Sequence, residues 1–208
     1  MTEQEVSEII EAELKFDQGV NDAFMNAQRK IADKILKRLG ILENGEEWKM
    51  LSKIVDANVR LGLFVIIPYV PGAGVVMPTG YFEHILKLYE VWQAVFQYFL
   101  DNYEKISCEK FKKDWPKEVV EESLRNTSIL YQKHYQEIAI ENKQAMMVDY
   151  ANFSLMHESF IWGMLAILGE ENFESFSKEV TEANSILMEY QAAIQDIEEP
   201  PEDPSSIN

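Results

Sequence analysis

The amino-acid sequence predicts an all-α fold, a single helical bundle of five to seven helices over residues 1–197. Apolar residues recur at intervals of three and four along most of the chain, the spacing that places side chains on one face of a helix. Capping signals precede several of these stretches. Strand-like alternation is absent from the sequence, apart from a short pairing that a Pro-Gly-Ala-Gly turn would allow. With 208 residues, of which 47% are apolar, the chain is long enough to bury a substantial core.

The first helix is expected to begin at a capping box. Thr2 and Glu5 have the spacing at which a hydroxyl and a carboxylate each accept a hydrogen bond from the other residue's backbone N–H group. Helical spacing then continues to Gly40, which is expected to end the run, with a break at Gly19. The N-terminal region is therefore predicted to be helical throughout, apart from this break.

A second capping-box pattern, Asn44 with Glu47, predicts a helix that runs into an uncharged segment, residues 61–82. This segment of 22 residues contains three prolines and four glycines, so no single straight helix can cross it. We expect a bent apolar hairpin between the second and third helices. The protein's own core, a partner or a lipid surface would each shelter such a hairpin, and the sequence leaves the three open.

The third helix carries the most regular pattern in the chain, seven apolar residues at alternating intervals of three and four. Six of the seven are aromatic, and a stripe of this kind is typical of a buried core rather than of a platform that stacks a flat ligand. We expect it to lie at the centre of the bundle. The stripe consists of Phe82, Ile85, Tyr89, Trp92, Phe96, Phe99 and Tyr103.

Residues 117–168 predict a helical region longer than an ordinary globular helix, because they contain no proline and a single glycine, Gly163. We expect a break near residues 149–152, where several weak helix formers come together. The Asn126-Thr127-Ser128 cluster is a second weak point in the same region.

The last amphipathic helix begins after Gly169 and resembles a coiled-coil seam in its 3, 4 spacing. We expect this seam to pack against a helix of the same chain, with a homodimer as the alternative. The tail, residues 198–208, combines acidic residues with proline and serine and is predicted to be disordered.

The net charge of −17 is concentrated at the C-terminal end of the chain. Residues 116–208 hold 5 basic and 18 acidic side chains and so carry −13 of the total. Such a charge repels phosphate backbones, and no lysine or arginine stripe offsets it, so direct nucleic-acid binding is not expected. The first residues lack the basic start and apolar run of a secretory signal, and the single cysteine, Cys108, suits a reducing compartment. We therefore expect a cytoplasmic protein.

The sequence lacks the residue patterns of the common catalytic sites. Its three histidines are scattered, Cys108 has no histidine near it in the sequence, and no glycine loop has the pattern that cradles phosphates. No cofactor is predicted. The predicted function is a non-enzymatic protein-interaction module of the adaptor, chaperone or inhibitor type, in which an acidic C-terminal face or a helical groove binds a protein partner, most simply a basic one. The predicted partner-binding residues are Glu170, Glu171, Glu174, Glu179 and Glu182.

Lipid or membrane-surface binding through the apolar hairpin is the first alternative function. An exposed apolar patch of this size would mark a binding surface, although the charge of −17 opposes anionic membranes. The residues that would make the contact are Phe64, Ile66, Ile67, Val75, Val76 and Met77.

A helical-bundle metalloenzyme is the second alternative. His134, Glu137 and Glu141 have the i, i+3, i+7 spacing that places one nitrogen and two carboxylates on one helix face, a ligand set suited to iron, manganese or zinc. The two Glu-x-x-His pairs of ferritin-like di-iron proteins are missing from the sequence. Solvated polar side chains are the plainer interpretation of the same three residues.

Overall fold

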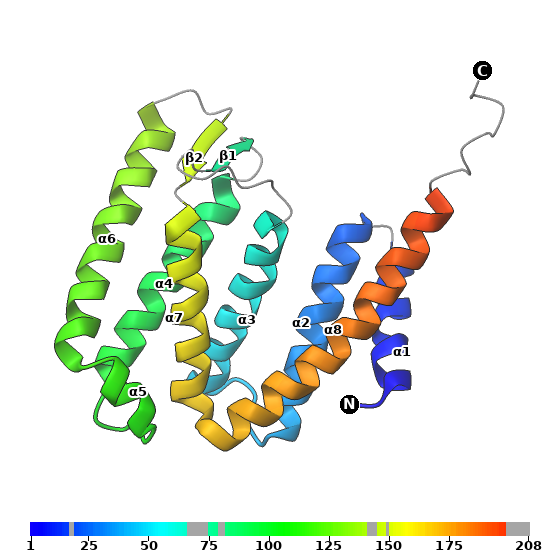
Figure 1. The fold of residues 1–208 in the computed structure, drawn as a ribbon, viewed down its shortest axis with the longest axis horizontal. Helices are drawn as coiled ribbons and strands as arrows, with labels where there is room; N and C mark the ends of the chain where they lie inside the picture. The colour runs from blue at the N-terminus through cyan, green and yellow to red at the C-terminus, as the bar shows by residue number, and fades with distance from the viewer. Residues whose placement is uncertain (17–18, 66–74, 79–81, 141–144, 149, 199–208) are drawn as a thin grey trace. The chain divides into compact units, whose positions relative to one another are not determined.

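The computed structural model describes residues 1–16, 19–65, 75–78, 82–140, 145–148 and 150–198 (Figure 1). Within these ranges the fold is all-α, as predicted, with eight helices and a ribbon of two short strands. The helix count exceeds the predicted five to seven because a six-residue helix, α5, forms in a short charged connection. The helices are α1 (Glu3–Leu14), α2 (Val20–Arg38), α3 (Glu46–Val65), α4 (Phe82–Asn102), α5 (Glu109–Asp114), α6 (Lys117–Ile140), α7 (Tyr150–Leu168) and α8 (Glu170–Glu198). The strands are β1 (Val75–Pro78) and β2 (Ala145–Val148).

The chain divides into two compact units. Unit 1 comprises residues 1–38 and 175–208, and unit 2 comprises residues 39–174. Unit 1 is therefore built from both ends of the sequence. The single domain over residues 1–197 stays a prediction, as does the disordered tail, because residues 199–208 lie outside the described part of the chain and Glu198 is the last residue of α8.

Unit 1 consists of α1, α2 and the C-terminal part of α8 (Figure 1). α1 ends at Leu14 and α2 begins at Val20, which confirms the break expected around Gly19. Gly40 follows α2 with a φ of 82°, a left-handed conformation that glycine adopts without strain and that often ends a helix. The buried apolar side chains of unit 1 include Val6, Ile10, Phe24, Ala27, Ile31, Ile35, Phe176, Ala183 and Leu187. The last three come from the predicted seam of α8, so the chain's own core buries these members of the seam.

The capping box at the start of α1 is present as predicted. The Glu5 N–H group donates to Thr2 Oγ1 at 3.2 Å, and the Thr2 N–H group donates to Glu5 Oε2 at 2.9 Å. Lys34 of α2 lies 2.9 Å from the other carboxylate oxygen of Glu5. Glu5 therefore links the first turn of α1 to its neighbour α2.

These contacts lower the pKa of Glu5 from 4.5 to about 2, chiefly through the Thr2 N–H group and then through Lys34. Because the folded-state pKa is depressed, the stability that Glu5 contributes is present above pH 4.5 and is lost as the pH falls from 4.5 through about 2. We expect Lys34→Gln to raise the pKa of Glu5 toward 4.5 in an NMR titration of its side-chain carboxyl carbon. Lys15→Gln, at the exposed C-cap position after α1, is the matched control, and equal shifts in the two variants would contradict the assignment.

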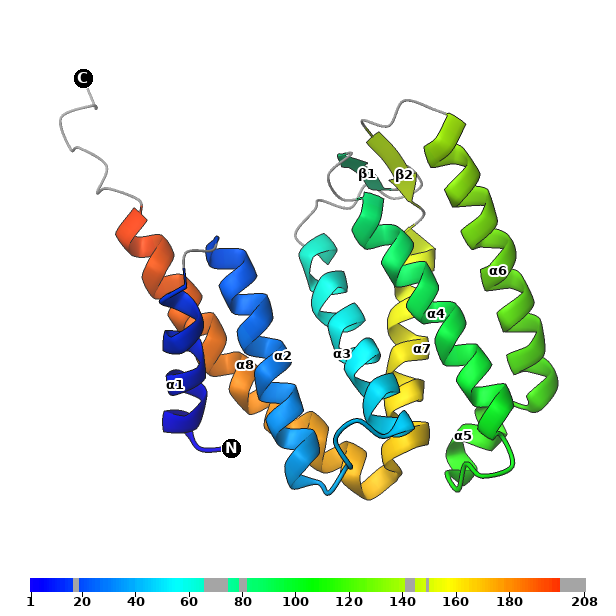
Figure 2. The same ribbon diagram turned by 180° about the vertical axis from the view of Figure 1, so that it is seen from behind.

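Unit 2 is organised around α4, which lies between α3 and α6 (Figure 2). α7 packs against both α3 and α4, and α5 packs against α7. Five members of the predicted aromatic stripe are buried, which confirms its place in the core: Ile85, Tyr89, Trp92, Phe96 and Phe99. The side chain of Gly163, a single hydrogen, lets α7 approach α3 and α4 closely.

The start of α3 differs from the prediction. Asn44 was expected to cap this helix, but it has a φ of 68°, in the left-handed region that asparagine tolerates better than most residues. The Gly45 N–H group donates to the Leu42 carbonyl at 3.1 Å, which closes a turn before the helix begins at Glu46. Asn44 thus forms part of the turn rather than the cap.

The two strands belong to connections that are far apart in the sequence: β1 lies between α3 and α4, and β2 lies between α6 and α7. β1 pairs with β2 in antiparallel register, with Val75 opposite Val148 and Pro78 opposite Ala145. β1 thus pairs with β2 of the α6–α7 connection, whereas the short pairing allowed across the Pro-Gly-Ala-Gly turn involves residues 66–74, which lie outside the described part of the chain. The break expected at residues 149–152 also comes earlier, since α6 ends at Ile140 and the extended β2 precedes α7.

Candidate functional site

The predicted acidic residues occupy two different environments on α8. Glu170, Glu171, Glu174 and Glu182 are exposed. Glu179 is largely buried, and its carboxylate accepts a hydrogen bond from the Arg38 guanidinium at 2.9 Å and also contacts the Met1 amino group. Glu179 therefore holds the helices of unit 1 together, whereas the other four face solvent.

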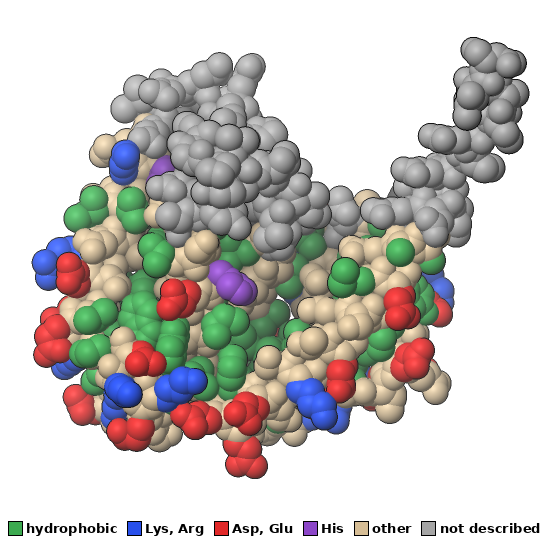
Figure 3. All heavy atoms as spheres, viewed as in Figure 1, with side chains coloured by type: hydrophobic (Ala, Val, Ile, Leu, Met, Phe, Trp, Pro, Cys, Tyr) green, Lys and Arg blue, Asp and Glu red, His purple; other side chains and the backbone are tan. Residues whose placement is uncertain are grey.

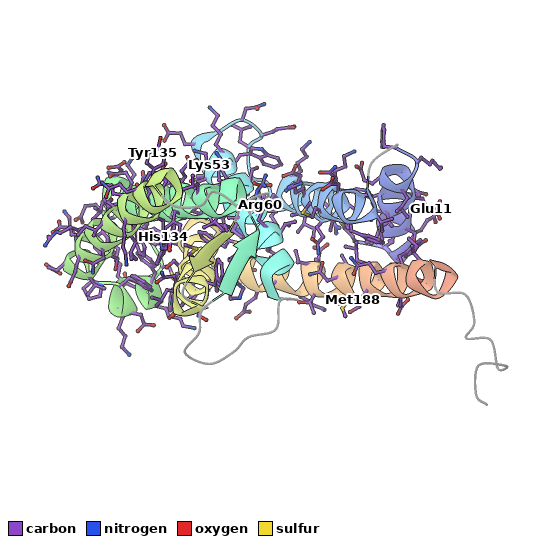
Figure 4. All side chains as sticks on the ribbon, turned by 90° about the horizontal axis from the view of Figure 1, so that it is seen from above. Glu11, Lys53, Arg60, His134, Tyr135 and Met188 are labelled. Atoms are coloured by element: carbon purple, nitrogen blue, oxygen red, sulfur yellow. The ribbon has the colours of Figure 1, made fainter. Side chains whose placement is uncertain are left out.

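Helix geometry places most of the exposed acids on one side of α8. With about 100° of rotation per residue, Glu171, Glu174, Glu182 and Glu189 fall within about 80° of arc. All four side chains are exposed, and none makes an ion pair with any residue that the structure describes. These four residues are called the α8 acidic face below; the exposed Met188 lies on the same helix (Figure 4).

Glu189 was missed in the sequence analysis, although a signal for it was present. It lies seven residues after Glu182, and so on the same side of the helix. Lys178 is the single basic residue among the 29 residues of α8, which contain eight acids. The four carboxylates are exposed and lie on one side of the helix. Their combined electrostatic potential therefore extends roughly one Debye length, about 8 to 10 Å, into solvent at physiological salt.

The histidine of the predicted metal set lies in the core of unit 2. His134 is buried, and its ring packs against Tyr89 with ring centroids 4.9 Å apart. The exposed Tyr135, the next residue, is on a different side of α6 (Figure 4). The Tyr89 hydroxyl in turn accepts a hydrogen bond from the Asn152 amide at 3.1 Å.

The remaining metal candidates are not brought to His134 by any described contact. Glu137 belongs to the last turn of α6, and Glu141 lies outside the described residues. Among the described side chains, no group of three or more histidine, cysteine, aspartate or glutamate residues is arranged to hold a metal ion. The metal site stays a prediction.

The apolar hairpin is described only in part. Phe64 belongs to the last turn of α3, and β1 contains Val75, Val76 and Met77, whereas Ile66 and Ile67 lie outside the described residues. None of the helices in the described ranges is long and apolar enough to cross a bilayer. Contact of the hairpin with a lipid surface stays a prediction.

Apolar side chains also reach the surface of unit 2. Figure 3 shows hydrophobic side chains gathered over α6 and α7 on the face toward the viewer. Large exposed apolar residues on these helices include Val119, Ile129, Leu155 and Ile161. Single exposed apolar residues are common on soluble proteins, so these positions do not by themselves mark a site.

Comparison of the chain with protein families, with curated proteins and with solved structures finds no match in any of the three. The candidate site therefore rests on the geometry of the chain itself.

Proposed function

We propose that the protein is a non-enzymatic interaction module of the adaptor, chaperone or inhibitor type, and that its α8 acidic face binds a basic segment of a protein partner. The observation that supports this proposal is the placement of Glu171, Glu174, Glu182 and Glu189, which are exposed, share one side of a helix and lack ion-pair partners among the described residues. Glu179 is left out of the face because Arg38 and the Met1 amino group already hold its carboxylate.

Charge complementarity favours a lysine- or arginine-rich partner. Opposite charges across an interface raise the association rate and suppress wrong partners more than they raise affinity. Because the face is solvent-exposed, its attraction is screened by salt. Binding through this face should therefore weaken as the ionic strength rises.

We expect reversal of Glu171, Glu174 and Glu182 to lysine to weaken binding of a lysine-rich helical peptide of about 20 residues, which spans about 30 Å. The expected loss is about tenfold in Kd at low salt, or about 1.4 kcal/mol. Titration calorimetry at about 20 mM and about 150 mM salt would measure the loss, which should shrink at the higher concentration.

The matched control reverses Glu104, Glu121 and Glu122, three exposed acids outside α8, and so changes the net charge by the same amount. A small loss in the control beside a large loss in the α8 variant supports the proposal. Equal losses would show that the total charge, and not the α8 acidic face, attracts the peptide.

A further inference from the structure

α6 has one principal neighbour in unit 2. Its 24 residues pack along α4, whereas α3 packs against both α4 and α7, and α7 packs against α3, α4 and α5. Figures 1 and 2 show α6 at the side of unit 2, beside α4. A helix held along one side buries a narrower stripe than a helix held on two sides.

The described side chains that α6 buries almost completely are few and mostly polar. They are Val120, Thr127 and His134, spaced seven residues apart, with exposed fractions of 0%, 2% and 6%. Leu124, Leu130 and Tyr131 are half-buried. α4 offers a sharp contrast, because eight of its apolar side chains are buried. Since apolar burial is the main source of packing free energy, we expect α6 to be held less firmly than α4.

The middle of α6 is also its weakest helical stretch. The hydroxyls of Thr127 and Ser128 both donate to the backbone carbonyl of Leu124, at 3.0 and 2.8 Å. Such hydrogen bonds compete with the main-chain ladder and slightly destabilise a helix. The Asn126-Thr127-Ser128 cluster singled out in the sequence therefore coincides with the polar part of the buried stripe.

The face of α4 beneath α6 contains a polar group that gains nothing from burial. Tyr89, Gln93 and Phe96 lie on one side of α4 at i, i+4 and i+7, and Tyr89 contacts His134 of α6. The side-chain nitrogen of Gln93 is buried and has no hydrogen-bond partner among the described residues. Water would satisfy this group if α6 moved away.

We propose that α6 is a lid on unit 2: it opens as one segment and uncovers the Tyr89–Gln93–Phe96 face of α4 while the rest of unit 2 stays folded. Three properties of α6 lower the free energy of this opening: its single principal neighbour, its polar buried stripe and the weak helical stretch at residues 126–128. The opening is a local unfolding equilibrium of the kind that amide hydrogen exchange detects.

Hydrogen exchange of the full chain, followed by mass spectrometry at low denaturant concentrations, tests the lid. Amides of residues 120–136 should be protected roughly 100-fold less than those of residues 156–165 in α7. Their exchange should also depend less on denaturant, because lid opening exposes less surface than unfolding of unit 2. Equal protection and equal denaturant dependence in α6 and α7 would overturn the proposal.

A pair of glutamine variants tests whether the polar interface sets the opening. Gln93→Leu replaces the buried amide with an apolar side chain of similar size and should slow exchange in α6 about tenfold, with no change in α7. Gln97→Leu, on the exposed side of the same helix, should leave α6 unchanged. Unchanged exchange in the Gln93 variant, or equal slowing in both variants, would show that the buried amide of Gln93 does not control the opening of α6.

Discussion

Replacement of Phe99 by alanine is expected to destabilise unit 2 by about 3–5 kcal/mol, which is a large part of the stability of an ordinary domain. The Phe99 ring is fully buried, with its centroid 4.6 Å from that of Phe111 and 6.0 Å from that of Phe96. Truncation would remove these ring contacts and leave a cavity between α4, α5 and α7. The surrounding helices are held on several sides, so the cavity would close only in part.

Tryptophan fluorescence in a urea titration measures this loss in unit 2 alone. All four tryptophans, Trp48, Trp92, Trp115 and Trp162, belong to residues 39–174, and unit 1 contains none. Leu42→Ala is the control, because this leucine also belongs to unit 2 and is 79% exposed, so its truncation should change stability little. A Phe99 variant with a urea midpoint close to that of the wild type would contradict the assignment of Phe99 to the core.

The α4 core could be predicted from the sequence because its pattern is local and strong. Seven apolar residues at helical spacing are compatible with a single helix face, and a face of mostly aromatic residues must be buried somewhere. The start of α1 was predictable for the same reason: Thr2 and Glu5 make a capping box within one turn. In both cases the residues that decide the structure are near neighbours in the chain.

The parts that were mispredicted depend on partners that are distant in the sequence. Residues 145–148, Ala-Met-Met-Val, are compatible with a helix, and only pairing with β1, some seventy residues earlier, makes them extended. A short stretch of apolar residues does not distinguish the two states. α5 was likewise missed because its six residues are too few to show a period, and a cysteine caps it: Cys108 Sγ accepts the Phe111 N–H group at 3.4 Å.

The composition of the α8 acidic face could be predicted only in part. Charge counting identified the helix, and four of the five glutamates proposed from it are exposed. Glu179 lies at the edge of the buried seam, three residues after Phe176 and four before Ala183, so the spacing itself placed it near the core. Its ion pair with Arg38 brings together the first and last parts of the chain, which no local pattern reveals.

The close approach of α7 to α3 and α4 depends on Gly163. A Cβ atom at this position would lie 2.8 Å from Ile54 Cδ1, 3.4 Å from Val95 Cγ1 and 3.8 Å from Phe99 Cζ. Gly163→Ala should change the free energy of unfolding little. The higher helix propensity of alanine contributes about 1 kcal/mol, which offsets the cost of moving the flexible end of the Ile54 side chain aside. Leucine adds atoms that no small movement accommodates, so Gly163→Leu should cost about 1–3 kcal/mol through overpacking.

A double-mutant cycle separates this steric effect from a general loss of stability. Ile54→Ala alone should destabilise unit 2 by about 2–5 kcal/mol, because it empties a buried site. In the Gly163→Leu background the same truncation makes room for the new side chain, so its cost should be smaller by about 0.5–3 kcal/mol. Urea titrations of the four proteins by tryptophan fluorescence give the coupling. Additive costs would mean that residues 54 and 163 do not touch, and that α7 does not pack on α3 through the glycine.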